Sequence, residues 1–261
     1  MRLALLFAVS AASLCAQLAP PNESGVSLGH IHLMSADPDV QKKFWVDVLG
    51  AQVTHAGTLE LLKLPGVFIV AGKARAAVEG SDGSSVPHIG FLVKSYAETK
   101  AKLTAAGLQF FSDNPATKQV NAFIPDKVIV EFTEDATLAI PLKFHHIHIA
   151  SPDGERGRAW YAKTFGAKPG TRGNFLATFL PGGEVDFRKA DAAQSPTKGR
   201  ALDHIGFEVK GLEAFVKKLQ AEGYTFEVPY REVPQLDNLK IAFLVDLDGV
   251  RIELTEGFAG K

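Results

Sequence analysis

Four segments of the chain alternate hydrophobic and polar residues with a period of two, and each is followed by a stretch with helical spacing. The first such segment spans residues 27–34, the second 87–93, the third 144–150 and the fourth 202–209. A period of two indicates a strand with one face against a core. Further short hydrophobic runs separated by glycine or proline follow each helical stretch. The pattern therefore predicts strand, helix and then several strands, four times over.

The expected helices have recognisable ends. The first opens at Asp37–Pro38, where a side-chain acceptor precedes a proline that needs no N–H, and it stops at Gly50. The second has Ser95 and Glu98 in the positions of a capping box and runs to Gly107. The third and fourth helices are expected to end at their own glycines, Gly166 and Gly223.

The second half of the chain repeats the first around its histidines and glutamates. His146 and His204 lie 116 positions after His30 and His88, so the two histidines of each half are 58 residues apart. Glu253 corresponds to Glu131 after a short insertion. Residues 134–141 show no periodicity and mark the expected boundary. We therefore predict two tandem domains, spanning 24–135 and 142–258.

Strand alternation indicates where these side chains point. In residues 30–33, His30 and His32 share one face, while the two aliphatic residues between and after them take the other. His146 and His148 repeat this arrangement, and Glu131 and Glu253 each lie between apolar neighbours. Charged groups buried on a curved sheet are costly unless they are paired or bind a metal. Two imidazoles and a carboxylate can bind a metal and leave open positions, as catalytic sites do.

Composition narrows the function classes. Hydrophobic residues make up 46% of the chain and the net charge is −1, so nothing favours binding to nucleic acid. Residues 1–16 resemble a signal peptide with cleavage after Ala16, which predicts a secreted or periplasmic protein. An uncleaved anchor or a disordered N-terminus is the alternative. No later segment reaches the roughly 20 apolar residues of a membrane span, so no membrane association is expected after cleavage.

The single cysteine, Cys15, lies within the predicted signal peptide. After cleavage, the protein would have no disulfide, no thiol nucleophile and no sulfur ligand. A bound metal would then depend on imidazole and carboxylate groups. The candidates are zinc, iron(II), manganese, nickel and cobalt.

These segments resemble the vicinal oxygen chelate superfamily, which includes glyoxalase I, bleomycin-resistance proteins and extradiol dioxygenases. The resemblance covers roughly residues 26–257 and is carried by GHIHLMSADPDVQKKFWVDVLGA, HHIHIASPDGERGRAWYAKTFGA, PHIGFLV with VIVEFTE, and DHIGFEV with VRIELTE. It implies an α+β fold of four βαβββ modules in two tandem glyoxalase/dioxygenase-like domains. Each domain would be a curled mixed sheet with helices on its outer face and a divalent metal within.

The resemblance also implies the ligands. Carried over position by position, the metal ligands are His30, His88, Glu131, His146, His204 and Glu253. Glyoxalase-like members use a fourth ligand in the last strand of the odd module, where the third module offers Glu184 and Asp186. Whether modules 1 and 2 share a cup, or the pairing crosses between the halves, is open from the sequence.

Other residues are candidates for chemistry beyond the metal. His32 and His148 lie two residues from a predicted ligand on the same face, so they are candidate catalytic acids or bases, or else additional ligands. His145 is expected to point to the opposite face and to be structural or exposed. Arg172, Arg188 and Arg231 could each hold a substrate carboxylate.

The expected function is that of an exported, divalent-metal-dependent enzyme. A glyoxalase-like lyase or isomerase would act on a small oxygenated molecule that chelates the metal through two oxygens. An extradiol-type ring-cleavage dioxygenase and a non-catalytic, resistance-type binding protein are the alternatives. The expected partner is a small-molecule substrate, and the oligomeric state stays open.

Overall fold

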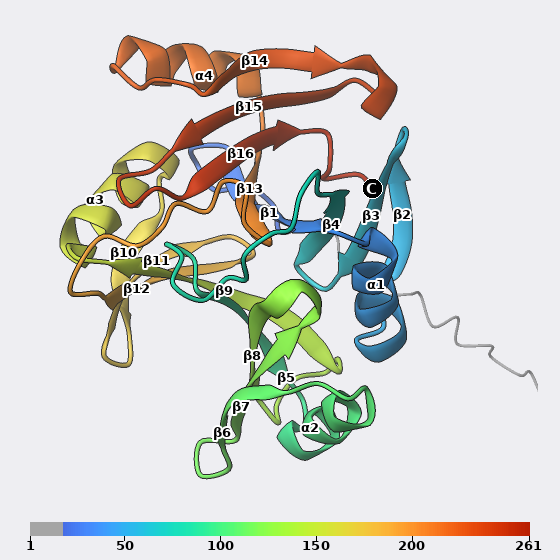
Figure 1. Cartoon of the computed structure of the whole chain (residues 1–261). Coiled ribbons are helices and arrows are strands. Elements are labelled where there is room, and N and C mark those ends of the chain that lie inside the picture. Colours follow the sequence, from blue (N-terminus) through green and yellow to red (C-terminus); the bar gives the residue numbers. More distant parts are fainter. Residues whose placement is uncertain (1–17) are drawn as a thin grey trace, which may run out of the picture.

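The computed structural model describes residues 18–261, and the predicted signal peptide at residues 1–16 lies outside them. The described chain forms four modules, each a strand, a helix and three further strands (Figure 1). Module 1 spans residues 26–73, module 2 spans 88–134, module 3 spans 142–189 and module 4 spans 202–256. The predicted α+β class and its fourfold strand, helix and strands pattern are confirmed.

In modules 1 and 2 the elements are β1 (Val26–Ser35), α1 (Pro38–Lys43), the π-helix η1 (Phe44–Val48), β2 (Gln52–Ala56), β3 (Leu59–Leu64), β4 (Val67–Lys73), β5 (His88–Val93), α2 (Tyr96–Ala105), β6 (Phe110–Asn114), β7 (Gln119–Ile124), η2 (Pro125–Lys127) and β8 (Val128–Glu134). In modules 3 and 4 they are β9 (Leu142–Ser151), α3 (Gly154–Phe165), β10 (Lys168–Arg172), β11 (Phe175–Leu180), β12 (Gly183–Lys189), β13 (Leu202–Val209), α4 (Leu212–Ala221), β14 (Val228–Val233), η3 (Pro234–Leu236), β15 (Leu239–Val245) and β16 (Arg251–Glu256).

The modules pair across the two halves of the chain. One eight-stranded sheet has the order β14-β15-β16-β13-β1-β4-β3-β2 and joins module 4 to module 1. The other has the order β10-β11-β12-β9-β5-β8-β7-β6 and joins module 3 to module 2. The seams are the antiparallel pairs β1–β13 and β5–β9. Each sheet therefore takes one module from 24–135 and one from 142–258, and we call the two units the 1/4 cup and the 2/3 cup.

The 1/4 cup curls until the two ends of its sheet touch. Thr58, in the turn between β2 and β3, donates its backbone N–H to the carbonyl oxygen of Gln235, in the turn between β14 and β15, at 3.0 Å. Gly57 lies so close that a Cβ there would be 2.2 Å from the same oxygen. In the 2/3 cup the corresponding glycine, Gly173, has no atom within 4 Å of its Cβ position. The turn between β2 and β3 therefore contacts the turn between β14 and β15 at the rim of the 1/4 cup. The turn that contains Gly173 in the 2/3 cup has no such close approach.

Most hydrophobic side chains pack on the helix-bearing faces of the sheets. Ile31 of β1 and Ile147 of β9 are buried in one large core with Trp45 and Phe165 from the helical segments of modules 1 and 3. The alternation that directs these side chains into the core directs the neighbouring histidines to the opposite face. A second, smaller cluster fills the 1/4 cup on the histidine face and includes Phe68.

The predicted helix ends agree with the structure, with one change. Asp37 caps α1 and Ser95 caps α2, where its hydroxyl accepts from the N–H of Glu98 at 3.3 Å. Gly166 ends α3 in a left-handed conformation with φ +64°. In module 1 the helix continues beyond α1 as the π-turn η1 before Gly50. This wider turn buries both Phe44 and Trp45 against the sheet.

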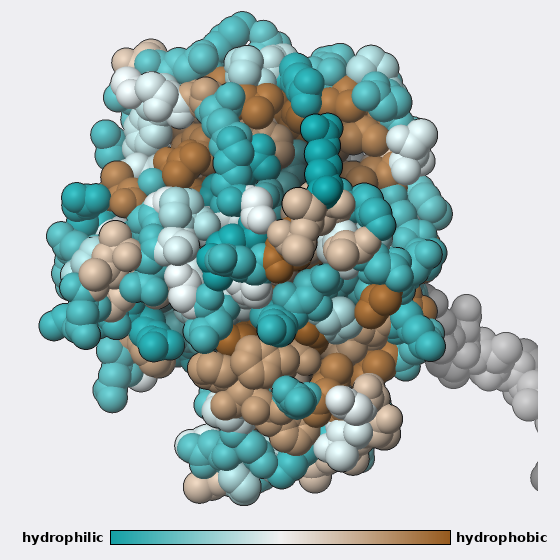
Figure 2. Space-filling view, viewed as in Figure 1, coloured by the Kyte–Doolittle hydropathy of each residue, from teal (hydrophilic) through white to brown (hydrophobic). Residues whose placement is uncertain are grey.

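Hydrophilic residues cover most of the face shown in Figure 2, and hydrophobic ones gather in its lower middle, where Figure 1 draws β5 and β8. Within residues 18–261, none of the helices has the length and apolar composition needed to cross a bilayer.

Candidate metal centres

The 1/4 cup brings together one predicted ligand from the first half and two from the second. The ligand atoms of His30, His204 and Glu253 lie within 4.8 Å of one another, and all three residues are buried. Nε2 of His30 is 2.9 Å from Oε2 of Glu253, and Nε2 of His204 is 3.0 Å from the same oxygen. Both imidazoles therefore converge on a single carboxylate oxygen.

The 2/3 cup brings together the equivalent residues. The ligand atoms of His88, Glu131, His146 and His148 also lie within 4.8 Å of one another. Nε2 of His88 is 3.4 Å from Oε2 of Glu131, and Nε2 of His146 is 3.7 Å from Oε1. All six predicted metal ligands thus fall into two sets, and each set combines residues from both halves of the chain.

The spacing in the 2/3 cup leaves buried nitrogen atoms without partners. Among the described residues, Nε2 of His88 and Nε2 of His146 are buried and make no hydrogen bond. Unpaired buried polar atoms are costly. Ligands held about 2.1 Å from a divalent ion lie about 3.0–3.4 Å apart in octahedral or tetrahedral geometry. The donor types and their separations therefore fit a divalent ion between these imidazoles and Glu131.

A glycine in each seam makes room for an imidazole. Gly90 lies opposite His146, and a Cβ on it would be 2.0 Å from Cε1 of that ring. Gly206 lies opposite His30 in the same way, and its Cβ would also be 2.0 Å from the ring. Sequence analysis missed these glycines, although the repeated HIG of residues 88–90 and 204–206 contained the signal.

In the 1/4 cup, a carboxylate orients one of the ligands. Nδ1 of His204 is 2.6 Å from Oδ1 of Asp203, which also accepts from Arg251 at 2.8 Å. This contact places a proton of His204 on Nδ1 and orients Nε2, the nitrogen that would bind an ion, toward Glu253, as carboxylates behind metal-binding histidines do. In module 2 the residue before the histidine is Pro87, which offers no such group.

Protonation equilibria differ between the cups. Burial opposes the charged form of His204, but its bonds to Asp203 and Glu253 outweigh burial and raise its pKa. Burial also opposes ionisation of Glu253, yet the bonds from His204 and His30 hold its pKa well below its usual range. In the 2/3 cup, burial and the neighbouring His148 lower the pKa of His146. His146 is therefore neutral near pH 7, the form that binds metals.

Additional charged residues surround the 2/3 cup on the side of β10 and β12. Arg172 forms ion pairs with Glu184 at 2.7 Å and with Asp186 at 2.5 Å. Asp186 is 0% exposed and its Oδ1 has no hydrogen-bond partner. Burial raises the pKa of Glu184 to about 7 and raises the pKa of Asp186 as well. A divalent cation bound here would favour the ionised forms of both carboxyl groups.

His148 and His32 take equivalent places in the two cups. His148 stacks on His88 with ring centroids 4.3 Å apart, and His32 stacks on His204 at 4.4 Å. Burial and the adjacent His88 lower the pKa of His148 to about 3. Burial and His204 lower the pKa of His32 to about 3 as well. Both predicted catalytic histidines therefore lie beside a predicted ligand as neutral imidazoles.

His145 does not point away from the cup as the alternation predicted. Its Nδ1 is 2.9 Å from Nδ1 of His146, and its Nε2 is 3.5 Å from Glu184. The reason is a register shift, since Gly90 pairs with His146 whereas Phe91 pairs with Phe144, so His145 is an extra residue on its strand. Such a bulge interrupts strict alternation. Of the three candidate arginines, Arg172 lies in the cup.

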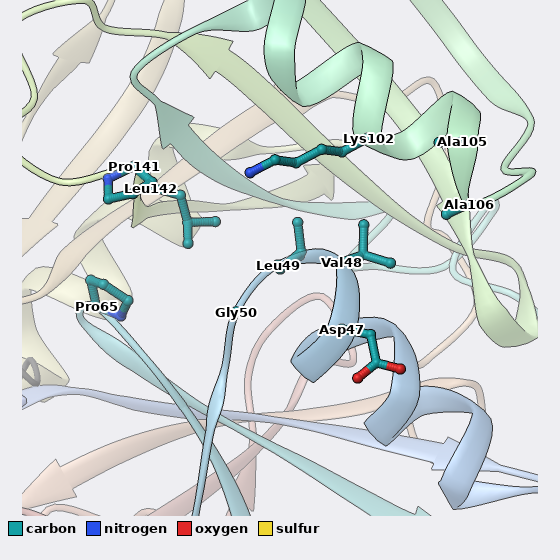
Figure 3. Close-up of a pocket in the computed structure, with 10 residues that line it drawn as sticks. All are labelled: Asp47, Val48, Leu49, Gly50, Pro65, Lys102, Ala105, Ala106, Pro141 and Leu142. Carbon is teal, nitrogen blue, oxygen red and sulfur yellow. The ribbon is translucent and has the colours of Figure 1, made fainter.

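A separate hollow of about 630 Å³ lies on the helix side of the molecule (Figure 3). Val48 and Leu49 at the end of η1 face Leu142 across it, and Lys102 of α2 extends over it. None of the predicted ligands is among the residues that line it. The hollow is therefore distinct from both candidate metal centres.

Comparison with known proteins agrees with this architecture. Residues 145–243 match the family model of the Glyoxalase/Bleomycin resistance protein/Dioxygenase superfamily. No curated protein sequence matches the chain. Glyoxalase I from Zea mays is 15% identical, with 88% of this chain and 92% of that chain covered and a TM-score of 0.67. A candidate dioxygenase from Bacillus subtilis is 16% identical, with 94% and 88% covered and a TM-score of 0.69.

At these identities the solved structures establish a shared fold and not a shared reaction. The family match covers most of modules 3 and 4, and the repeated sequence and structure extend the same architecture to modules 1 and 2. The protein thus has a two-cup fold shared with these structures, residues 145–243 match the superfamily's model, and the fold that the sequence resemblance predicted is confirmed.

Proposed function

We propose that this protein is an exported, divalent-metal-dependent enzyme with glyoxalase-like lyase or isomerase chemistry, and that the 2/3 cup is its reaction site. The observation that carries the proposal is the pair of buried, unpartnered Nε2 atoms of His88 and His146 beside Glu131. The carboxyl groups of Glu131, Glu184 and Asp186 around them are oxygen donors that suit a divalent ion. Zinc, iron(II), manganese, nickel and cobalt all suit such ligands.

A metal ion bound there would act as a Lewis acid toward two neighbouring oxygens of a small substrate. The protein's own contribution is to orient the substrate and to donate a hydrogen bond to its oxygen. Nε2 of His148 accepts a hydrogen bond from Arg172 at 2.9 Å, so the proton of this neutral imidazole resides on Nδ1. That Nδ1 is buried and has no partner among the described residues. His148 is thereby placed to donate a hydrogen bond from its Nδ1–H to a substrate oxygen, as a neutral imidazole can.

Arg172 has a positioning role in this proposal. It holds Asp186 and Glu184 as ion pairs, and its guanidinium also lies 5.7 Å from the centre of the Phe175 ring. These contacts fix Arg172 against His148 and so fix the tautomer of that histidine. Loss of the guanidinium would free Nε2 and allow the proton to move to it.

Proton exchange tests the reaction class directly. The metal-loaded protein should exchange the carbon-bound proton of an α-hydroxycarbonyl compound for deuterium, as followed by NMR. The variant His148→Gln should lose most of this exchange while it retains its metal, and His88→Ala should lose both. Metal-loaded protein that exchanges no proton with any compound of this class would exclude the lyase or isomerase proposal.

One observation favours a second candidate function in the 1/4 cup. His30, His204 and Glu253 form a two-histidine, one-carboxylate set, the ligand type used by non-haem iron(II) oxygenases. Aromatic residues adjoin this set, with Phe258 against His30 and Phe243 against His204. Oxygen consumption that requires both iron(II) and an aromatic diol would support an extradiol-type dioxygenase.

Export is proposed from the apolar run at residues 3–13 and the small residues before position 17. Mass analysis of secreted protein should find an N-terminus at Gln17. Secreted protein that begins at Met1 would contradict cleavage after Ala16.

A further inference from the structure

A phenyl ring from the C-terminal segment fills the 1/4 cup beside the candidate metal ligands. Residues 257–261 follow β16, and we call them the strap. Phe258 of the strap is 1% exposed, and its ring centroid lies 5.3 Å from that of His30. On its other side it lies 5.9 Å from the ring of Phe68. The space next to the ligand set is therefore occupied by a group of the protein itself.

Side-chain contacts hold the strap, and no strand pairing does. Oε1 of Glu208 accepts the backbone N–H groups of Gly257, Phe258 and Ala259 at 2.8, 3.0 and 3.1 Å. Lys63 donates to the backbone oxygen of Lys261 at 2.7 Å. The strap begins at Gly257, whose φ of +137° is a conformation that other residues rarely adopt. The strap can therefore leave the cup without breaking a strand ladder.

The walls around Phe258 are apolar. The second hydrophobic cluster contains Phe258 together with Phe68, Val70 and Phe243, all buried. Phe68 and Val70 lie beside His30 and His32 in the sheet, and Phe243 lies beside Glu253. A space of this shape and lining suits an uncharged aromatic ring, because burial of such a ring removes apolar surface from water without leaving polar groups unpaired.

We propose that the strap is a displaceable plug and that the 1/4 cup binds an uncharged aromatic molecule in the place of Phe258. Displacement of the strap exposes a ring-sized apolar site next to His30, and the arriving ring replaces the contacts that Phe258 gives up. The site exists whether or not a metal is bound, so its test is independent of the proposed reaction.

Hydrogen exchange tests the plug in the full-length, metal-free protein. The amides of residues 257–259 should exchange at least one hundredfold faster than those of β15 and β16, and saturating phenol should accelerate them further. The variant Glu208→Gln weakens the shared acceptor and should accelerate strap exchange at least tenfold. The matched control Glu213→Gln, at an exposed position of α4, should exchange as the wild type does.

Phenol affinity, measured by calorimetry, tests the ligand class. Phe258→Ala should bind phenol at least tenfold more tightly than the wild type, because its side chain no longer competes for the site. Glu208→Gln should shift affinity in the same direction and provides the test if Phe258→Ala does not fold. Strap amides that exchange only with global unfolding, or phenol affinities equal in the wild type and the variants, would overturn the proposal.

Discussion

The two cups carry the same histidine and glutamate set but differ in the residues beside it. In the 1/4 cup, Phe68 lies opposite His30 in the sheet, Val70 lies opposite His32 and Phe243 lies opposite Glu253. At the corresponding positions the 2/3 cup has Glu184, Asp186 and Asn121. The repetition of the ligands therefore does not imply that the cups do the same chemistry, because the walls determine charge, access and ligand class.

The distances between the histidine nitrogens and the glutamate oxygens also differ between the two cups. In the apolar 1/4 cup, the histidines lie 2.9 and 3.0 Å from Glu253 and are hydrogen-bonded to it. In the polar 2/3 cup the equivalent separations are 3.4 and 3.7 Å. An apolar environment strengthens hydrogen bonds among the ligands themselves. The polar cup instead places the carboxyl groups of Glu184 and Asp186 beside its ligands, and burial raises the pKa of both groups.

The largest expected effect comes from removal of the Arg172 guanidinium from the 2/3 cup. Arg172→Met should lower the free energy of unfolding of the metal-free protein by about 3 kcal/mol, because buried Asp186 and Glu184 lose their partner. Urea unfolding measures this, and saturating divalent metal should recover part of the loss.

Lys217→Met is the control, since it removes an exposed i,i+4 pair with Glu213. It should change stability by less than about 0.5 kcal/mol. If Arg172→Met is as stable as this control, the charge difference between the cups has no energetic consequence.

Substitution of the seam glycines should lower the stability of the protein nearly as much. Gly90→Ala places a methyl group on the ring of His146 and should cost about 2 kcal/mol of stability and displace that ligand. Gly206→Ala should do the same to His30 in the 1/4 cup. Thermal unfolding and metal titration measure the two effects.

The control is Gly260→Ala, because no atom lies within 4 Å of that Cβ position. It should behave as the wild type. Tolerance of alanine at both seam positions would show that the imidazoles are not fixed by the facing strand.

Substitution of Asp203 should weaken metal binding in the 1/4 cup alone. Asp203→Asn weakens the acceptor behind His204 and should lower metal affinity there by about 10–100-fold. The 2/3 cup, with Pro87 at that place, should keep its affinity. Metal titration of each cup measures the difference, and the exposed Asp191→Asn is the control. An equal loss in both cups would contradict a local role for Asp203.

The smallest effect concerns pH. The pKa of His204 is raised above its usual value, so protons compete for the 1/4 cup as the pH falls from 8 to 6. The pKa values of His146 and His148 are lowered, so the 2/3 cup stays unprotonated over this range. Metal affinity at the 1/4 cup should fall by up to about tenfold as the pH drops, while the 2/3 cup changes little.

Two single-cup variants separate these profiles. Glu131→Ala leaves the 1/4 cup to be titrated, and Glu253→Ala leaves the 2/3 cup. A steeper pH dependence in Glu253→Ala than in Glu131→Ala would reverse the predicted order.

Much of the fold could be predicted from the sequence because hydrophobic periodicity and helix caps are local signals. Strand alternation identified the inward faces of His30 and His146, and Asp37 and Ser95 marked true helix starts. The pairing of modules could not be predicted, because residues far apart in the chain decide which seam forms. The bulge at His145 was also missed, since one extra residue leaves no mark in a single sequence.

The residues that lie beside the ligands in each cup could be predicted only in part. Glu184 and Asp186 were recognised as candidates because the family resemblance implies a fourth ligand in that strand. Their neutralisation by Arg172 and the insertion of Phe258 into the other cup depend on distant segments meeting in three dimensions. The ligand set was therefore predictable, and its surroundings were not.

Each candidate metal centre combines ligands from both halves of the chain. Metal content of purified double variants tests it most directly. The wild type should bind two divalent ions per chain, and His30→Ala with Glu253→Ala should leave one, because both changes fall in the 1/4 cup. His30→Ala with Glu131→Ala should leave none, because the changes fall in different cups. The opposite result, no ion in the first double variant and one in the second, would contradict the crossed pairing.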